Sequence, residues 1–336
     1  MKLIVAAREL VRNLDIDAAI ASYKDAIVYN DFPFQARVEL GRLLINSGQI
    51  DNGLSLLEST YKIFPNKYEA VSMLGAAYQR LRNNDKAKVI ELFNKAIKLN
   101  PNAPSWVFYG AGKYASDIVA FDDPALAYVP MPKCGSSTIK AHILKIGQNV
   151  KTINPHIFFE NPFFTTSGKK IEDYPKHYKF VVLRDPIDRF LSYYNNNILA
   201  QDSLSIPFNN NTVIFGLDTK PEINELISRW HEYCFVFDDF KHHTLPQSAY
   251  LGTNLSAFND VFLLENIDSL LPKLTKFFKS KELPKHLMKS EKPISNLYSQ
   301  LTVNSLDILL DIYKDDYQLG SGLYSSRRIV DQVKHK

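Results

Sequence analysis

The sequence predicts an α/β protein in two parts: an α-helical repeat domain over residues 1–105, and an α/β domain with a mostly parallel sheet over residues 106–336. Two observations support this prediction. Small and apolar residues recur at a fixed spacing through the first hundred residues. Beyond them, two short apolar runs each lead through a polar turn into a helical segment, which is the pattern of strands and helices that alternate around a parallel sheet.

The repeat has a period of 34 residues, because a shift of that length brings five columns of similar residues into register. The columns are Ala6, Leu40 and Leu74; Ala7, Gly41 and Gly75; Leu10, Leu44 and Tyr78; Asp17, Asp51 and Asp85; and Ala19, Gly53 and Ala87. Such a helix–turn–helix unit resembles the tetratricopeptide repeat, over roughly residues 1–100. The resemblance implies three units that hold a protein partner or another copy of the chain. An ordinary helical bundle remains the alternative.

Composition excludes several classes of protein. The formal net charge is only +4, from 40 Lys and Arg against 36 Asp and Glu, so nucleic acid is not expected as a partner. The two cysteines, Cys134 and Cys234, cannot form a disulfide framework. The N-terminus is apolar for too short a stretch to be a signal peptide, and no apolar run is long enough to span a membrane. We therefore expect a cytoplasmic protein.

The first apolar run, residues 126–129, leads into a turn that is suited to binding phosphate. A glycine lets the backbone approach an anion, and the following helix adds N–H groups and a partial positive charge. Hydroxyl and ammonium groups add further donors. The candidate residues are Lys133, Cys134, Gly135, Ser136, Ser137 and Thr138. The lysine precedes the glycine, so this is not the loop of nucleoside triphosphatases.

The second apolar run, residues 180–183, has the continuous apolar character of a buried central strand. Arg184 follows it, Pro186 suits the first turn of a helix, and Ser192 lies two helical turns further on. An arginine and a hydroxyl in this spacing favour binding of a terminal phosphate. Asp188 and Arg189 are candidates for surface or structural ion pairs.

Together these segments resemble the sulfotransferases that use 3′-phosphoadenosine 5′-phosphosulfate (PAPS), in particular the carbohydrate sulfotransferases of the family 2 type. The resemblance spans residues 125–320 and includes three later segments: 243–247 (His-Thr-Leu-Pro-Gln), 261–265 and 312–317. It implies a P-loop-like α/β domain with PAPS as cofactor, 3′-phosphoadenosine 5′-phosphate (PAP) as product and no metal. Lys133–Thr138 would bind the 5′-phosphosulfate, and Arg184 with Ser192 the 3′-phosphate. The acceptor would be a hydroxyl of a carbohydrate or glycolipid.

Catalysis would need a general base for the acceptor hydroxyl, and histidine is the side chain best suited to this near neutral pH. Members of the resembled family place a histidine or glutamate base between the two cofactor motifs. His156 lies in that interval and is the preferred candidate, with Lys133 as the second catalytic residue. The alternatives are His142, His177, His243 and Glu160.

Two other functions compete with this one. In the first, the repeats carry the function: the protein is a protein-interaction module, and its nucleotide-binding domain is catalytically inactive. A nucleotide-dependent kinase is disfavoured by the absent Gly-Lys-Ser/Thr ending. Because both phosphate motifs lie beyond residue 125, we expect the second domain to fold and bind PAP without residues 1–100.

Overall fold

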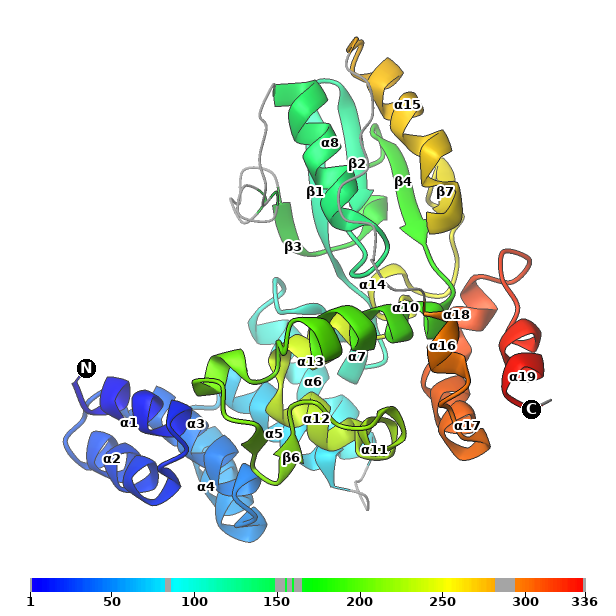
Figure 1. Cartoon of the computed structure of the whole chain (residues 1–336). Coiled ribbons are helices and arrows are strands. Elements are labelled where there is room, and N and C mark those ends of the chain that lie inside the picture. Colours follow the sequence, from blue (N-terminus) through cyan, green and yellow to red (C-terminus); the bar gives the residue numbers. More distant parts are fainter. Residues whose placement is uncertain are drawn as a thin grey trace. The chain divides into compact units, whose positions relative to one another are not determined.

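A computed structural model of the chain describes residues 2–81, 86–148, 155, 159, 165–281 and 294–334. The chain divides into two compact units, and Figure 1 labels most of their helices and strands. The first comprises Met1–Ala103, Val107–Gly112 and Asn197–Lys241, and the second comprises Pro104–Trp106, Lys113–Asn196 and His242–Lys336. This grouping differs from the division predicted at residue 105, because Asn197–Lys241 joins the helical unit although it lies inside the predicted second domain.

The first unit begins with six helices that pack as three consecutive pairs. They are α1 (Lys2–Arg12), α2 (Ile16–Val28), α3 (Pro33–Asn46), α4 (Ile50–Ile63), α5 (Tyr68–Arg80) and α6 (Lys86–Leu99). The pairing is consistent with the predicted repeats and explains their small residues. A Cβ on Gly41 would lie 2.6 Å from Leu57, and a Cβ on Gly53 would lie 2.8 Å from the Gly41 carbonyl oxygen. The α3–α4 crossing therefore has no room for a side chain there.

Residues 197–241, which we call the inserted segment, also belong to this unit. Its elements contact the repeat helices: η3 contacts α1, and α12 contacts α5. The ring of Phe215 packs against the core formed by α1, α2 and α3. The remaining elements of this unit are α7 (Ser105–Gly110), η3 (Ile206–Phe208), β5 (Val213–Ile214), β6 (Leu217–Asp218), α11 (Ile223–Ser228), α12 (Trp230–Val236) and α13 (Asp238–Thr244), whose last turn enters the second unit.

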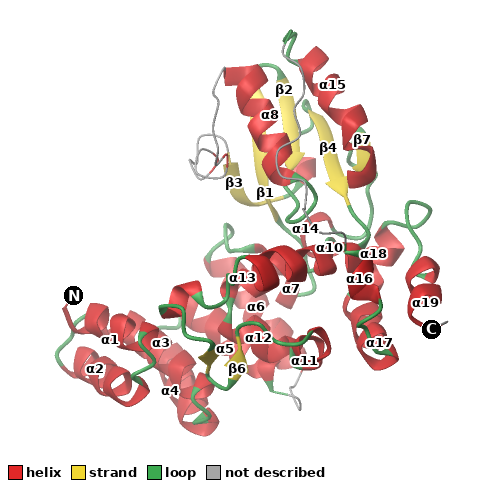
Figure 2. Cartoon of the chain, viewed as in Figure 1, coloured by secondary structure: helices red, strands yellow, loops and turns green. Residues whose placement is uncertain are grey.

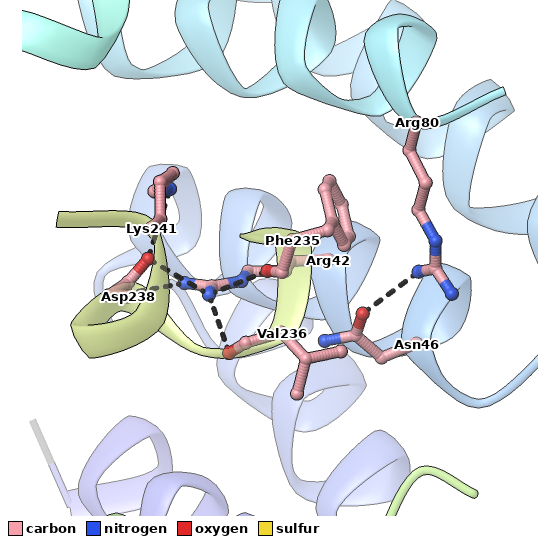
Figure 3. A network of polar contacts seen from close by, with 7 residues as sticks. All are labelled: Arg42, Asn46, Arg80, Phe235, Val236, Asp238 and Lys241. Atoms are coloured by element: carbon pink, nitrogen blue, oxygen red, sulfur yellow. Dashed lines mark hydrogen bonds and ion pairs between the residues drawn. The ribbon is translucent and has the colours of Figure 1, made fainter. Parts of the chain in front are cut away.

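Arg42 of the repeats holds the inserted segment through polar contacts, and Arg80, which donates a hydrogen bond to Asn46, lies over one of its rings (Figure 3). Arg42 on α3 donates hydrogen bonds to the carbonyl oxygens of Phe235, at 2.9 Å, and Val236, at 3.1 Å. It also pairs with the Asp238 carboxylate at 3.2 Å. The guanidinium of Arg80 on α5 lies 4.9 Å from the centre of the Phe235 ring. The first helix of each pair thus contacts this segment.

The second unit is built on a sheet of five strands in the order β3-β1-β2-β4-β7 (Figure 2). The strands are β1 (Ser116–Asp122), β2 (Ala125–Val129), β3 (Thr165–Lys169), β4 (Tyr178–Leu183) and β7 (Asp260–Leu263). β2, β4 and β7 are parallel neighbours, and β1 is antiparallel to both β2 and β3. Only β1 therefore runs against the others, which confirms the predicted mostly parallel sheet. Phe180, Val181, Val182 and Leu183 are all fully buried, as expected of a central strand.

Three helices follow the parallel strands at one edge of the sheet, because β2 leads to α8, β4 to α10 and β7, through η4, to α15. The carboxyl ends of β2 and β4 are neighbours, so the segments that follow them meet there. The helical elements of this unit are α8 (Ser136–Gln148), η1 (Ile171–Asp173), α10 (Pro186–Tyr193), the start of η2 (Tyr194–Ala200), α14 (Ser248–Leu251), η4 (Leu264–Asn266), α15 (Ile267–Phe277), α16 (Ser295–Tyr298), α17 (Val303–Ile312), α18 (Lys314–Leu319) and α19 (Arg327–Lys334). Within the described residues, no helix has the length and apolar character needed to cross a membrane.

Candidate functional site

The turn between β2 and α8 has a tightly wound backbone. Lys133 has a φ of 63° and Gly135 a φ of 74°, so both adopt the left-handed conformation. This conformation suits glycine but is uncommon for a residue with a side chain, and it costs free energy at Lys133. A Cβ on Gly135 would also lie 2.8 Å from Leu264. The turn delivers the chain directly to Ser136, where α8 begins and the first N–H groups lack partners within the helix.

The side chains of the turn differ in how deeply they are buried. Ser136 and Thr138 are buried, and Lys133 and Ser137 are half-buried. The Cys134 thiol is fully buried, and burial raises its pKa to about 12. It lies 3.7 Å from the Oε1 atom of Gln247, to which it donates. The cysteine side chain therefore points into the protein, and a cofactor contact from Cys134 would have to come from its backbone.

Arg184 stands at the end of β4, next to this turn. Its Nη1 atom donates to the carbonyl oxygen of Lys133 at 3.4 Å, so the structure brings the two predicted phosphate-binding segments together. The Nε atom of Arg184 is buried and makes no hydrogen bond with any described residue. A buried guanidinium donor without a partner is suited to an anionic ligand. Ser192, the other predicted residue of this segment, is buried on α10.

Asp185 forms the N-cap of α10, which explains why the chain turns so sharply after β4. Its Oδ1 atom accepts hydrogen bonds from the backbone N–H groups of Ile187, at 3.0 Å, and Asp188, at 3.2 Å. Burial, with a smaller contribution from the Asp188 carboxylate, raises the pKa of Asp185 to about 6. The site therefore contains a carboxyl group whose charge costs free energy at neutral pH.

This raised pKa predicts how the Asp185→Asn variant responds to pH. Wild-type stability from this group is greatest below about pH 4 and falls as the pH rises towards 6, because the unfolded chain releases the proton first. The loss is on the order of 3 kcal/mol for a shift from 3.8 to about 6. Asparagine keeps the capping oxygen but does not ionise. The free energy of unfolding, measured with urea between pH 4 and 7, should rise for the variant relative to wild type as the pH increases. The same dependence on pH in both proteins would contradict this.

Asp188 and Arg189 both have structural roles. Of the two roles expected from the sequence, a surface ion pair or a structural one, the structure favours the second. The Arg189 side chain is fully buried and donates to the carbonyl oxygens of His243, at 2.9 Å, and of Leu245. Asp188 pairs with Arg328 at 2.7 Å. Arg189 thus holds the 243–245 backbone beside α10.

Gln247 is the residue of the site whose importance the sequence did not reveal. In the sequence, only a resemblance identifies the 243–247 segment, and that resemblance assigns no role to its glutamine. In the structure this side chain is fully buried and bonds to both phosphate-binding segments. Three segments far apart in the sequence meet at one amide, and only the assignment of 243–247 to a family element could have pointed to it.

The candidates for the general base differ in where the structure places them. His156 and Glu160 lie outside the described residues. His142 packs within the domain: its Nε2 atom lies 3.1 Å from the Leu271 carbonyl oxygen, and burial lowers its pKa. The Nε2 atom of His177 lies 3.3 Å from the Asp122 carboxylate, just before β4 and at the opposite end of that strand from Arg184.

His243 remains as a described alternative, with its ring stacked on Tyr193 at 5.2 Å between centroids. In the part of the chain that the structure describes, no group of three or more His, Cys, Asp or Glu side chains could hold a metal ion.

Comparison with models of known protein families gives a match over most of the chain that follows the repeats. The family model described as "Sulfotransferase family" matches residues 116–319, a range that includes the turn after β2, Arg184, Gln247 and α18. No curated protein matches the chain.

Proposed function

We infer the reaction from the premise that the chain belongs to the sulfotransferase family, whose model matches more than half of its length. We propose that it moves the sulfuryl group of PAPS to a hydroxyl of a carbohydrate or glycolipid. One observation carries the proposal: the turn after β2 and Arg184 lie within hydrogen-bonding distance of each other, at the carboxyl ends of neighbouring parallel strands. A ligand with two separated phosphates fits such a pair of segments.

PAPS supplies an activated sulfuryl group on its 5′-phosphate, and it carries a second phosphate at the 3′ position. In the proposal, the turn holds the 5′ end through the first N–H groups of α8, the hydroxyls of Ser136, Ser137 and Thr138, and the Lys133 ammonium. Arg184 and Ser192 hold the 3′-phosphate. The buried, unpartnered Nε atom of Arg184 supports this fit, because a phosphate oxygen would complete its hydrogen bonding.

Catalysis in this proposal comes from positioning and from charge, by analogy with phosphoryl transfer. Lys133 and the N–H groups of the turn stabilise the negative charge that grows on the leaving phosphate. His156 accepts the proton of the acceptor hydroxyl as general base. No metal takes part.

The Arg184→Ala variant should bind PAP more weakly by about 1.5–3 kcal/mol, the free energy of a charge-assisted hydrogen bond in a buried site. Adenosine 5′-phosphosulfate, which lacks the 3′-phosphate, should bind the variant and wild type almost equally. Isothermal titration calorimetry measures both, and Arg327→Ala, at an exposed arginine of α19, is the control. Equal losses for the two ligands would contradict the assignment of Arg184 to the 3′-phosphate.

Calorimetry with PAP against ATP tests the function as a whole, together with transfer of radioactive sulfate from PAPS to a panel of glycans and glycolipids. We expect PAP to bind at least tenfold more tightly than ATP and at least one glycan to become labelled. An inactive nucleotide-binding domain that serves the repeats would label none, and a kinase would prefer ATP.

We propose further that the repeats bind a protein partner or a second copy of the chain, and that the enzyme works in the cytoplasm. The tetratricopeptide-like pattern supports the first statement, and the low cysteine content supports the second. Light scattering of the purified protein over a range of concentrations tests self-association directly. A single monomeric mass at all concentrations would leave a different protein as the partner.

A further inference from the structure

We propose that Gln247 is a positioning residue that sets the separation between the two phosphate-binding segments. The inference rests on the proposed function, since it takes the turn after β2 and Arg184 as the two ends of one PAP site. It goes beyond that function in assigning a role to a side chain that would touch neither phosphate.

The Gln247 amide bonds to both segments at once. Its Oε1 atom accepts from the backbone N–H of Arg184 at 3.2 Å, and it lies 3.7 Å from the Cys134 sulfur, whose thiol donates to it. Its Nε2 atom donates to the Arg184 carbonyl oxygen at 2.9 Å. The end of β4 and the turn after β2 are therefore tied to one rigid planar group.

The Gln247 backbone is itself held in place. The N–H groups of Gln247 and Ser248 each donate to one oxygen of the Asp316 carboxylate, both at 2.7 Å. Asp316 is fully buried on α18. Arg189 holds the three residues from His243 to Leu245 through their carbonyl oxygens. Because its backbone is held in this way, the Gln247 amide keeps a fixed position, and the two segments that bond to it are held at a fixed separation.

The contacts of Gln247 require both the carbonyl oxygen and the NH₂ group of its amide. A carboxylate could accept from Arg184 and Cys134, but it would place a second acceptor against the Arg184 carbonyl oxygen. An apolar side chain would satisfy none of these groups and would leave the two segments joined only by the Arg184–Lys133 hydrogen bond and by the pairing of β2 with β4. A ligand whose two phosphates lie at a fixed distance binds best to sites already held at that distance, because less freedom is lost on binding.

The test compares ligands with one and with two phosphates on the Gln247→Met variant, which is close to glutamine in shape. The ligands are PAP, adenosine 5′-monophosphate and adenosine 3′-monophosphate, measured by calorimetry or by competition. We expect the affinities of the two monophosphates to stay within about threefold of wild type. The affinity of PAP should fall by about tenfold or more, because only PAP must reach both segments.

Two further variants sharpen the result. Cys134→Ala removes only the contact on the side of the turn and should show a smaller loss specific to PAP. Gln247→Glu keeps the acceptor and loses the donor; should the methionine variant fail to fold, as judged by thermal unfolding, this variant decides the question. Phe258→Leu, on a separate loop before β7, serves as a control for general changes of packing.

Separate outcomes bear on the inference and on the proposed function. Unchanged PAP affinity in a folded Gln247 variant would overturn the positioning role. Equal losses for all three ligands would also overturn it, since they would indicate general damage to the site. Wild-type protein that binds PAP no better than adenosine 5′-monophosphate would instead contradict the proposed PAP site.

Discussion

Replacing His156 by glutamine is expected to lower the turnover number by a factor of about 10² to 10⁴ while the affinity for PAP stays nearly constant. A general base acts on the acceptor proton in the transition state and contributes little to binding of the nucleotide. Glutamine has a similar size and polarity but cannot take up the proton. Turnover measured with saturating acceptor, and PAP affinity measured by calorimetry, give the two quantities separately.

Two comparison variants distinguish the role of a base from other kinds of damage. Lys133→Ala should reduce both turnover and PAP affinity, because the ammonium is proposed to contact the nucleotide and to stabilise charge in the transition state. His177→Gln, at the end of β4 opposite to Arg184, should leave turnover within about threefold of wild type. A His156→Gln variant with nearly normal turnover would pass the role of base to His243 or Glu160.

Removing residues 2–103 is expected to give insoluble or aggregated protein. The sequence alone leads us to expect that the remaining chain folds by itself. The packing of the inserted segment on the helices that would be lost favours the opposite outcome. Phe215 contacts the core of the first repeats, and Phe235 lies beneath Arg80. Without the helices these rings would form an exposed apolar patch, which promotes aggregation. Gel filtration and light scattering of the truncated protein measure the outcome.

A point variant tests the same packing in the intact chain. Arg42→Met removes the hydrogen bonds to the carbonyl oxygens of Phe235 and Val236, and it should cost about 1–3 kcal/mol in the free energy of unfolding. Arg12→Ala, which removes an exposed pair on α1, should change stability by less than about 0.5 kcal/mol. A truncated protein that is soluble, monomeric and binds PAP normally would show that the inserted segment does not depend on the repeats.

The sequence predicts those parts of the fold that residues close together along the chain determine. The apolar run of residues 180–183, followed by Arg184 and Pro186, predicts a buried strand and the start of a helix, and the structure has β4 and α10 there. The turn after β2 was predicted in the same way from its glycine and hydroxyl residues. Periodicity and capping act within a few residues, so a single sequence contains this information.

What the sequence did not predict depends on contacts between distant segments. Arg189 could have been a surface residue by its local pattern, yet it is fully buried because three carbonyl groups from residues 243–245 surround its guanidinium. Gln247 acquires its role only when β2, β4 and α18 are brought together. The packing of residues 197–241 on the repeats is of the same kind, since nothing within that segment identifies the helices that it contacts.

The interrupted order of the first unit has a consequence for synthesis on the ribosome. The repeat helices emerge first, but Asn197–Lys241, which packs against them, follows only after the strands β1 to β4 have been made. At the usual 5–20 residues per second, the roughly ninety residues between these parts take about 5–20 s to translate. For that interval the nascent repeats carry apolar surface from α1, α3 and α5 that the finished protein covers.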